Sequence, residues 1–203
     1  MVAMSPDSAS ISREQLAELP IRRYEGPIHL LETVGDLDRA MADIRAESVL
    51  GFDTETRPAF RKGESHSPSL VQLATERAVY LFPLRRLACA DALGEILGSP
   101  DLIKAGVAMA HDLRQLRQLF PFEAAGMVDL GTLARHRGLE QTGLRNLAAL
   151  LLGFRIPKGA RTTNWAAPHL TQAQVRYAAT DAWVGRELFL HFQRLGQTEF
   201  RFP

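Results

Sequence analysis

The chain has 203 residues and a formal net charge of +1, and 46% of its residues are hydrophobic. This length and apolar content support one domain with a sizeable core, and the balanced charge neither indicates nor excludes nucleic-acid binding, because a local basic strip can suffice. The single cysteine, Cys89, excludes an internal disulfide and fits a reducing compartment, so we expect a cytoplasmic protein. Because no long apolar run or apolar signal segment is present, we expect neither a membrane span nor a secretory signal.

The predicted elements follow a Ser-rich segment, 1–12, that is typical of a loose terminus. A short apolar strand is expected at 28–31, and Thr33 is a candidate cap for the amphipathic helix after it. The apolar run at 49–55 predicts a buried strand. The segment 56–68 contains two prolines and a glycine, so it is expected to be a loop.

Two strands are expected next, at 69–75 and 78–82, joined by a short polar turn at Glu76-Arg77. A helix at 89–97 and an apolar strand at 102–109 follow. Strand pairs therefore come first, and strands alternate with helices afterwards. This order favours a single α/β domain in which helices flank a central mixed sheet.

The second half of the chain is expected to be mainly helical, with helices at 110–120, 130–134, 144–151 and 172–195 and a basic loop at 155–168. Leu119 is expected on the buried side of the first of these helices. Asp129 and Thr171 are candidate caps, and Gly153 is a candidate helix end. No internal repeat or linker divides the chain; we expect an N-terminal extension, 1–24, followed by one domain at 25–203.

Two acids, Asp53 and Glu55, flank Thr54 at the end of the strand 49–55. Strand side chains alternate between faces, so the two carboxylates point the same way. Neighbouring carboxylates repel each other, and a hard divalent cation between them would offset that repulsion. The alternative is that both acids simply face water.

Further candidate residues lie in two later helices. Asp112 stands at the start of the helix that follows the strand 102–109, where ligands of α/β folds gather; it could instead be an acid favoured by the helix dipole. Tyr177 and Asp181 are four residues apart and therefore share a helix face. A mid-helix aspartate among alanines needs a partner for its charge, whereas Tyr177 alone is commonly a core aromatic.

Together these segments resemble the DEDD superfamily of 3′-5′ exonucleases, over about residues 28–195. The chain is similar to the tyrosine (DEDDy) subgroup, which includes ribonuclease D and the Werner-protein exonuclease domain. The motifs that carry the resemblance are Phe52-Asp53-Thr54-Glu55, Leu70-Val71-Gln72-Leu73, Lys104-Ala105-Gly106-Val107 leading to Asp112, Asn164-Trp165, and Tyr177-Ala178-Ala179-Thr180-Asp181. A histidine-type relative would carry His where Arg176 stands.

The resemblance implies a ribonuclease H-like fold and a metal-dependent 3′-5′ exonuclease that releases nucleoside 5′-monophosphates. It implies that Asp53, Glu55, Asp112 and Asp181 hold two divalent ions, Mg²⁺ or Mn²⁺, with Asp53 between them. Tyr177 would position the attacking water, because a phenol with a pKa of about 10 is a poor base at neutral pH.

The expected partner is a nucleic acid with a free 3′ end. Basic residues follow the first motif and precede the third, which makes a phosphate-contacting role plausible for the set. We expect substrate contacts from Thr54, Phe60, Arg61, Lys62, Lys158, Arg161 and Trp165. Phe60 could stack on a terminal base or pack under its own loop, and Trp165 is expected to brace its loop against the fold.

Two other functions stay open from the sequence. A non-catalytic nucleic-acid-binding module is disfavoured because all five motif positions are filled. A hydrolase of short oligonucleotides or other small phosphodiesters fits the modest net charge. The sequence does not choose between DNA and RNA, and it leaves protein partners open.

Overall fold

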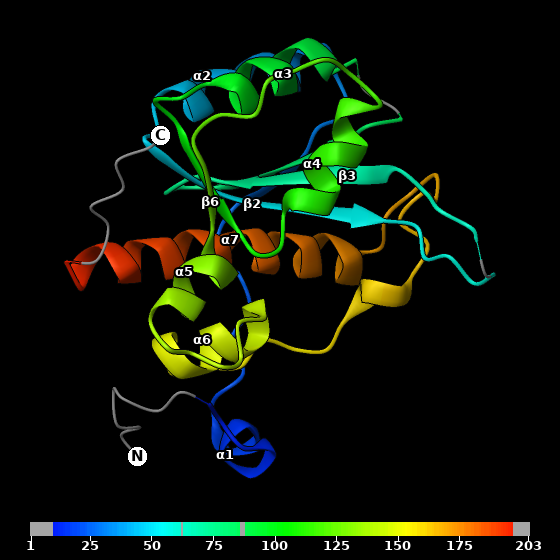
Figure 1. The fold of residues 1–203 in the computed structure, drawn as a ribbon. Helices are drawn as coiled ribbons and strands as arrows, with labels where there is room; N and C mark the ends of the chain where they lie inside the picture. Colours follow the sequence, from blue (N-terminus) through cyan, green and yellow to red (C-terminus); the bar gives the residue numbers. More distant parts are fainter. Residues whose placement is uncertain (1–9, 62, 86–87, 197–203) are drawn as a thin grey trace.

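The computed structural model describes residues 10–61, 63–85 and 88–196 of the chain. A six-stranded sheet with the order β1-β4-β3-β2-β5-β6 forms its centre (Figure 1). The strands are β1 Ile28–Leu30, β2 Val49–Thr56, β3 Pro68–Ala74, β4 Val79–Pro83, β5 Ile103–Gly106 and β6 Met127–Asp129. β3 pairs antiparallel with β2 and β4, and the other pairs are parallel. The predicted mixed α/β sheet is confirmed.

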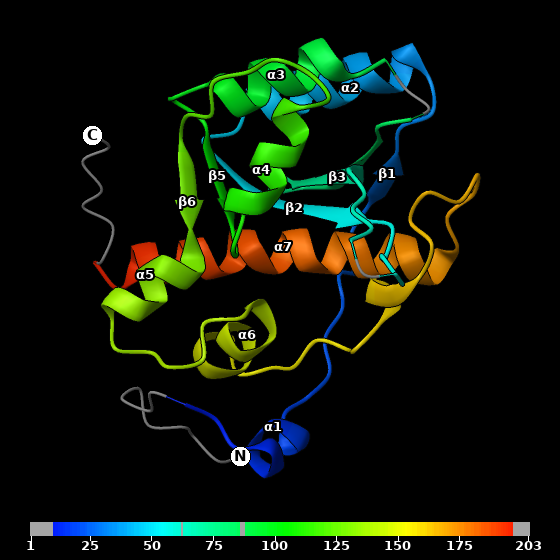
Figure 2. The same cartoon turned by 45° about the vertical axis from the view of Figure 1, so that its right-hand side comes forward.

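Helices cover both faces of this sheet (Figures 1 and 2). The helices are α1 Arg13–Glu18, α2 Val34–Arg45, α3 Ala90–Gly98, α4 Ala110–Arg117, α5 Leu130–His136, α6 Leu144–Leu152 and α7 Gln172–Arg194, with a 3-10 turn η1 at Ala160–Thr162. α2 and α3 lie on one face, where their apolar residues pack against Leu50 and Phe52 of β2. The long helix α7 crosses the opposite face, and α5 and α6 lie beyond it.

The predicted helix ends are confirmed where a local signal marks them. Thr33 and Thr171 form capping boxes with Asp36 and Gln174 at the starts of α2 and α7. Gly153 ends α6 with a positive φ of 71°.

Two predicted elements are shorter than expected. The strand predicted at 102–109 ends at Gly106, and the chain turns through Ala108, whose φ is 57°. The prediction for Leu119 is wrong, because α4 ends at Arg117 and the Leu119 side chain is 46% exposed. The backbone N–H groups of Leu119 and Phe120 both donate to the Leu116 carbonyl, which tightens the helix end and turns Leu119 outward.

Three elements were not predicted: α1, β6 and the turn η1. Residues before β1 nevertheless pack onto the domain. Ile11 is buried, Ile21 bridges to Arg155, and the Tyr24 N–H donates to the Thr180 hydroxyl. The division into an extension at 1–24 and a domain at 25–203 stays a prediction.

Small residues allow α7 to lie directly against β2. A Cβ atom added to Gly51 would come within 1.9 Å of the Ala182 carbonyl oxygen. One added to Gly185 would come within 2.9 Å of the Ala105 carbonyl oxygen. The side-chain direction of position 51 therefore faces α7, and Asp53 and Glu55 share that direction because strand positions alternate.

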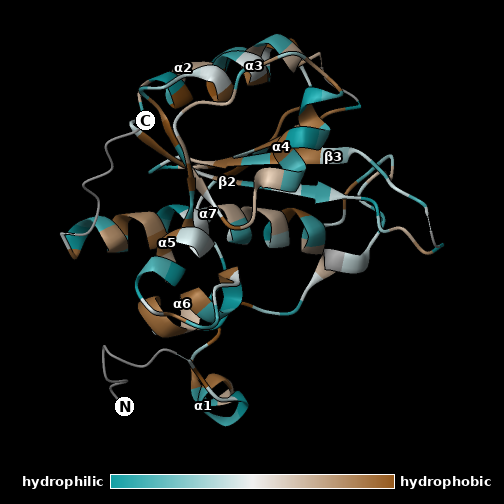
Figure 3. Cartoon of the chain, viewed as in Figure 1, coloured by the Kyte–Doolittle hydropathy of each residue, from teal (hydrophilic) through white to brown (hydrophobic). Residues whose placement is uncertain are grey.

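The hydropathy of the chain matches this layering (Figure 3). The start of β2 is hydrophobic and its acidic end is hydrophilic, as are the outer surfaces of α2 and α3. In the part of the chain that the structure describes, no helix combines the length and apolar character needed to cross a membrane. The hydrophilic end of β2 carries Asp53 and Glu55 at the border of the apolar core.

Lys104 of β5 is fully buried, and its Nζ donates to the Ser99 carbonyl oxygen at 2.6 Å. Burial lowers the pKa of this ammonium from 10.5 to about 8. Between these two values the unfolded chain binds more protons than the folded protein, so the free energy of unfolding should rise with pH, by about 3 kcal/mol in total. We expect Lys104→Met to lose this rise, which urea denaturation of both proteins at pH 7, 8, 9 and 10 will measure. Parallel curves for the two proteins would contradict the prediction.

Candidate active site

The two acids of the first motif lie near the end of β2. Asp53 is paired with Gln72 and Glu55 with Leu70 across the antiparallel β2–β3 ladder. Glu55 is buried and Asp53 is partly buried. Because both side chains point to the α7 side of the sheet, they face the residues of α7 that pack against this end of β2.

α7 presents Tyr177 and Asp181 at this place. Asp53, Glu55 and Asp181 each offer a carboxylate oxygen, and these oxygens all lie within 4.8 Å of one another. Asp112, the third residue of α4, does not belong to this close group. Its charge nevertheless acts on Asp53. The fold therefore brings three of the predicted carboxylates together and places the fourth nearby.

The pKa values of Asp53 in β2 and Asp112 in α4 show that their ionised forms are unfavourable in this site without a counter-charge. Burial raises the pKa of Asp53 well above its usual value, and the charges of Asp181 and Asp112 raise it further, while the backbone N–H of Thr54 opposes the increase. Burial also raises the pKa of Asp112, against the opposing effects of His111 and the nearby Thr54 hydroxyl. The Thr54 side chain is thus turned toward Asp112 and makes no hydrogen bond of good geometry within the described residues.

The pKa values of Tyr177 and Asp181 in α7 are also raised. Burial raises the pKa of Asp181 to about 7, although the Tyr177 phenol and the Arg145 charge both favour its ionised form. Burial, followed by the charges of Asp181, Glu55 and Asp53, raises the pKa of Tyr177. The phenol therefore keeps its proton at neutral pH and acts as a hydrogen-bond donor.

The ring of Tyr177 is held from two sides. The buried indole of Trp165 packs against it, with ring centroids 6.1 Å apart. A Cβ atom added to Gly159 would come within 2.4 Å of the Tyr177 ring. Trp165, 2% exposed, therefore braces the loop before α7, as expected, and helps to fix the phenol.

Arg145 is a residue of this site that the sequence reasoning missed. It stands second in α6, and its positive charge acts on Asp181. Its Nε is buried and has no hydrogen-bond partner among the described residues. A cation in the first turn of a helix opposes the helix dipole, and this was the available sequence signal.

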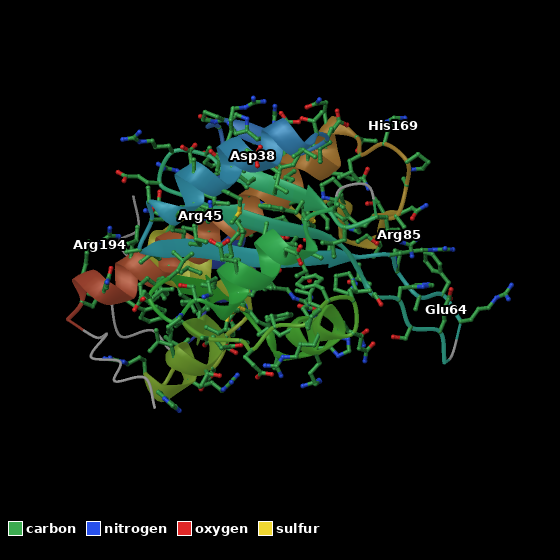
Figure 4. All side chains as sticks on the ribbon, turned by 90° about the horizontal axis from the view of Figure 1, so that it is seen from above. Asp38, Arg45, Glu64, Arg85, His169 and Arg194 are labelled. Carbon is green, nitrogen blue, oxygen red and sulfur yellow. The ribbon has the colours of Figure 1, made fainter. Side chains whose placement is uncertain are left out.

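Several candidate substrate residues lie on loops, whereas Thr54 is a residue of β2. Phe60 is 79% exposed on the loop that follows β2, so it does not pack under that loop. Arg61 is exposed on the same loop and Lys158 on the loop before η1. Figure 4 shows Glu64 of the first loop, Arg85 and His169 at the same end of the molecule. Lys62 and the Arg161 side chain lie outside the described part of the structure.

The donor set fits a divalent metal. Carboxylate oxygens are the ligands that hard cations such as Mg²⁺ and Mn²⁺ prefer. Burial raises the pKa values of Asp53, Asp112 and Asp181, and a bound cation would favour their ionised forms. The acidic cluster is therefore compatible with metal binding.

The sheet and the crossing helix α7 bring acidic side chains together beside a phenol, an arrangement that suits hydrolysis assisted by divalent metal ions. The sequence model of the 3′-5′ exonuclease family matches residues 28–197. The chain belongs to this family, and family membership together with its ribonuclease D homologues identifies it as a 3′-5′ exonuclease domain.

Several proteins are similar to this chain. The human exonuclease mut-7 homolog is 30% identical over 85% of the chain, and ribonuclease D of Gluconacetobacter diazotrophicus is 34% identical over 75% of it. The solved EXO domain of Aedes aegypti Nibbler is 26% identical, with a TM-score of 0.76, and the match covers 89% of this chain and 94% of that one. Escherichia coli RNase D, at 22% identity and a TM-score of 0.72, shares the fold.

The matched region is a small part of most of these proteins. It spans 24% of the human mut-7 homolog and 39% of the ribonuclease D. The comparison therefore assigns the domain and its class of reaction.

Proposed function

We propose that this chain hydrolyses DNA or RNA one nucleotide at a time from the 3′ end, using two divalent metal ions, Mg²⁺ or Mn²⁺, and releasing nucleoside 5′-monophosphates. Asp53, Glu55, Asp112 and Asp181 would hold the ions. The observation that carries the proposal is that carboxylate oxygens of Asp53, Glu55 and Asp181 lie within 4.8 Å of one another, close enough to the Tyr177 phenol for their charges to raise its pKa.

The chemistry divides between the ions and the side chains. When bound, a pair of divalent ions lowers the pKa of the attacking water and offsets the charge on the leaving 3′-oxygen. Tyr177 keeps its proton because its pKa is raised, so it does not act as a base. Its hydroxyl instead positions the attacking water by hydrogen bonding. Arg145 supplies a positive charge next to Asp181, which favours the ionised form of that carboxylate.

The loops supply the remaining contacts in this proposal. Exposed Arg61 and Lys158 offer charge to the phosphate backbone, and exposed Phe60 offers a face for a terminal base. Lys62 and Arg161 stay in the proposed set. A nucleic-acid substrate is also supported by a structural relative, Trypanosoma brucei RNase D, which has been solved in complex with RNA U12.

Tyr177→Phe is expected to lower kcat by about 10²-fold, since it removes only the group that positions the water. The affinity for Mn²⁺ should stay within about threefold of wild type, because the carboxylates stay in place. Steady-state cleavage measures kcat, and calorimetric titration measures the affinity for Mn²⁺. Tyr24→Phe is the matched control: its phenol donates to the Arg77 carbonyl outside the site, and its kcat should be unchanged. Equal kcat for Tyr177→Phe and wild type would remove Tyr177 from the mechanism.

The function itself is tested by digesting 5′-labelled DNA and RNA, each as single strands and recessed duplexes, with Mg²⁺ or with Mn²⁺. A ladder that shortens from the 3′ end is expected on at least one substrate, and it reveals the preferred sugar. A protein that binds the strands without shortening any of them would support the non-catalytic binding module instead. Faster cleavage of a dinucleotide than of a long strand would favour the small-phosphodiester hydrolase.

A cytoplasmic location is part of the proposal. It is supported by the presence of one cysteine, Cys89, which is buried and free. Cell fractionation followed by detection of the chain tests it.

A further inference from the structure

Gln72 of β3 is a buried polar side chain without a partner. It is fully buried, and within the described residues neither its Oε1 nor its Nε2 makes a hydrogen bond. A buried amide that forms no hydrogen bond destabilises the fold, and an apolar side chain of the same size would not. The position therefore keeps a glutamine at the expense of stability.

The register of the sheet places this amide beside the acidic cluster. Gln72 is the direct partner of Asp53 in the β2–β3 ladder, and opposite residues of such a pair share a face. The residues two positions away, Leu70 and Ala74, pack in the cluster formed with the small residues of α7. Gln72 thus lies between β3 and α7, on the side where Asp53 and Asp181 meet.

Reach and chemistry both fit Asp53 as the acceptor. Side chains of directly opposite residues have Cβ atoms about 4.5–5.5 Å apart, so a glutamine amide reaches the neighbouring carboxylate by side-chain rotation alone. Asp53 accepts the backbone N–H of Thr54, and a carboxylate has room for further donors. The amide group of Gln72 supplies two N–H donors.

We propose that Gln72 is a positioning residue of the exonuclease site, whose amide N–H donates to the Asp53 carboxylate and fixes its orientation toward the divalent ions. The inference rests on the proposed function and extends it. Groups that hold a ligand in place through a hydrogen bond commonly change metal affinity or activity by about 10–100-fold when they are removed.

The test is Gln72→Met, which keeps the length of the side chain and removes its hydrogen-bonding groups. Mn²⁺ is titrated by calorimetry into metal-free protein, and the melting temperature and kcat are measured alongside. We expect the Kd for Mn²⁺ to rise by about 10-fold or more and kcat to fall, while the metal-free melting temperature is equal to or above that of wild type. If Gln72 had only a structural role, its replacement would change the melting temperature and leave the Kd for Mn²⁺ unchanged.

Ser69→Ala is the matched control. Ser69 is a second buried polar residue of β3 whose hydroxyl lacks a hydrogen bond among the described residues, and it is paired with neither acid of β2. Its Kd for Mn²⁺ and its kcat should equal those of wild type. Gln72→Leu serves as a second variant, with the same expected result, if the methionine variant does not fold.

Wild-type affinity for Mn²⁺ in a folded Gln72 variant would overturn the inference. A wild-type protein that binds no Mn²⁺ and cleaves no substrate would instead overturn the proposed function. The two failures are distinguished because the first appears only in the variant.

Discussion

Asp53→Asn is expected to lower turnover by at least about 10³-fold while making the metal-free protein more stable at pH 7. The loss follows because Asp53 belongs to the carboxylate cluster proposed to hold the ions. The gain follows because burial and the charge of Asp181 raise the pKa of Asp53, so its ionised form is unfavourable in the folded protein. Cleavage rates and thermal melts of the metal-free proteins measure the two effects.

The gain should depend on pH with a defined sign. A carboxyl whose pKa is raised by folding binds more protons in the folded protein, so the contribution of Asp53 to stability falls as pH rises above the usual carboxyl pKa of about 4. The asparagine variant lacks this contribution, and the difference between the two melting temperatures should grow over the same range.

Asp129→Asn is the control for this prediction. Asp129 also ends a strand, but it caps α5 by accepting the Thr132 N–H, which asparagine can also do. Its turnover should equal that of wild type. An Asp53→Asn enzyme with more than a tenth of wild-type turnover would contradict the proposed site.

Gly51→Ala is expected to destabilise the protein by more than about 3 kcal/mol, a large effect for one methyl group. The added Cβ would lie 1.9 Å from the Ala182 carbonyl oxygen and 2.8 Å from the Arg186 nitrogen. Both contacts are with backbone atoms of α7, so no side-chain rotation relieves them. The free energy of unfolding, measured by urea denaturation, checks the prediction.

The same substitution at Gly35 is the matched control. An added Cβ there meets atoms at 3.8 Å, which is ordinary contact, and alanine favours the helix α2. Gly35→Ala should therefore be neutral or slightly stabilising. If Gly51→Ala unfolded at the same urea concentration as Gly35→Ala, the close approach of α7 to β2 would be wrong.

Much of the fold was predictable because its signals are local. The ends of α2 and α7 follow from Thr33 and Thr171, whose side chains cap the helices within three residues. The strand predicted at 102–109 was too long because apolar residues after Gly106 continue the pattern, although the chain turns at Ala108, whose φ is positive. β6, three residues long like the predicted β1, was missed because its last residue, Asp129, was assigned to the cap of the next helix and not to a strand.

In the candidate site too, local patterns were predictable and contacts between separate elements were not. Alternation along β2 and the four-residue spacing in α7 were enough to group Asp53 with Glu55 and Tyr177 with Asp181. The meeting of the two groups depends on the absence of a side chain at Gly51, which spacing does not reveal. The approach of Arg145 to Asp181 and the pairing of Gln72 with Asp53 both join separate elements. Only the position of Arg145 in the first turn of α6 gave a local signal.

α7 packs against β1, β2, β3, β4 and β5 and also carries Tyr177 and Asp181. The same helix therefore packs across most of the sheet and carries two of the five residues proposed to act in catalysis. A substitution at an outer strand that tilts α7 slightly would misalign the phenol and the aspartate while the protein still melts normally. In this architecture, lost turnover is an earlier sign of damage than lost folding.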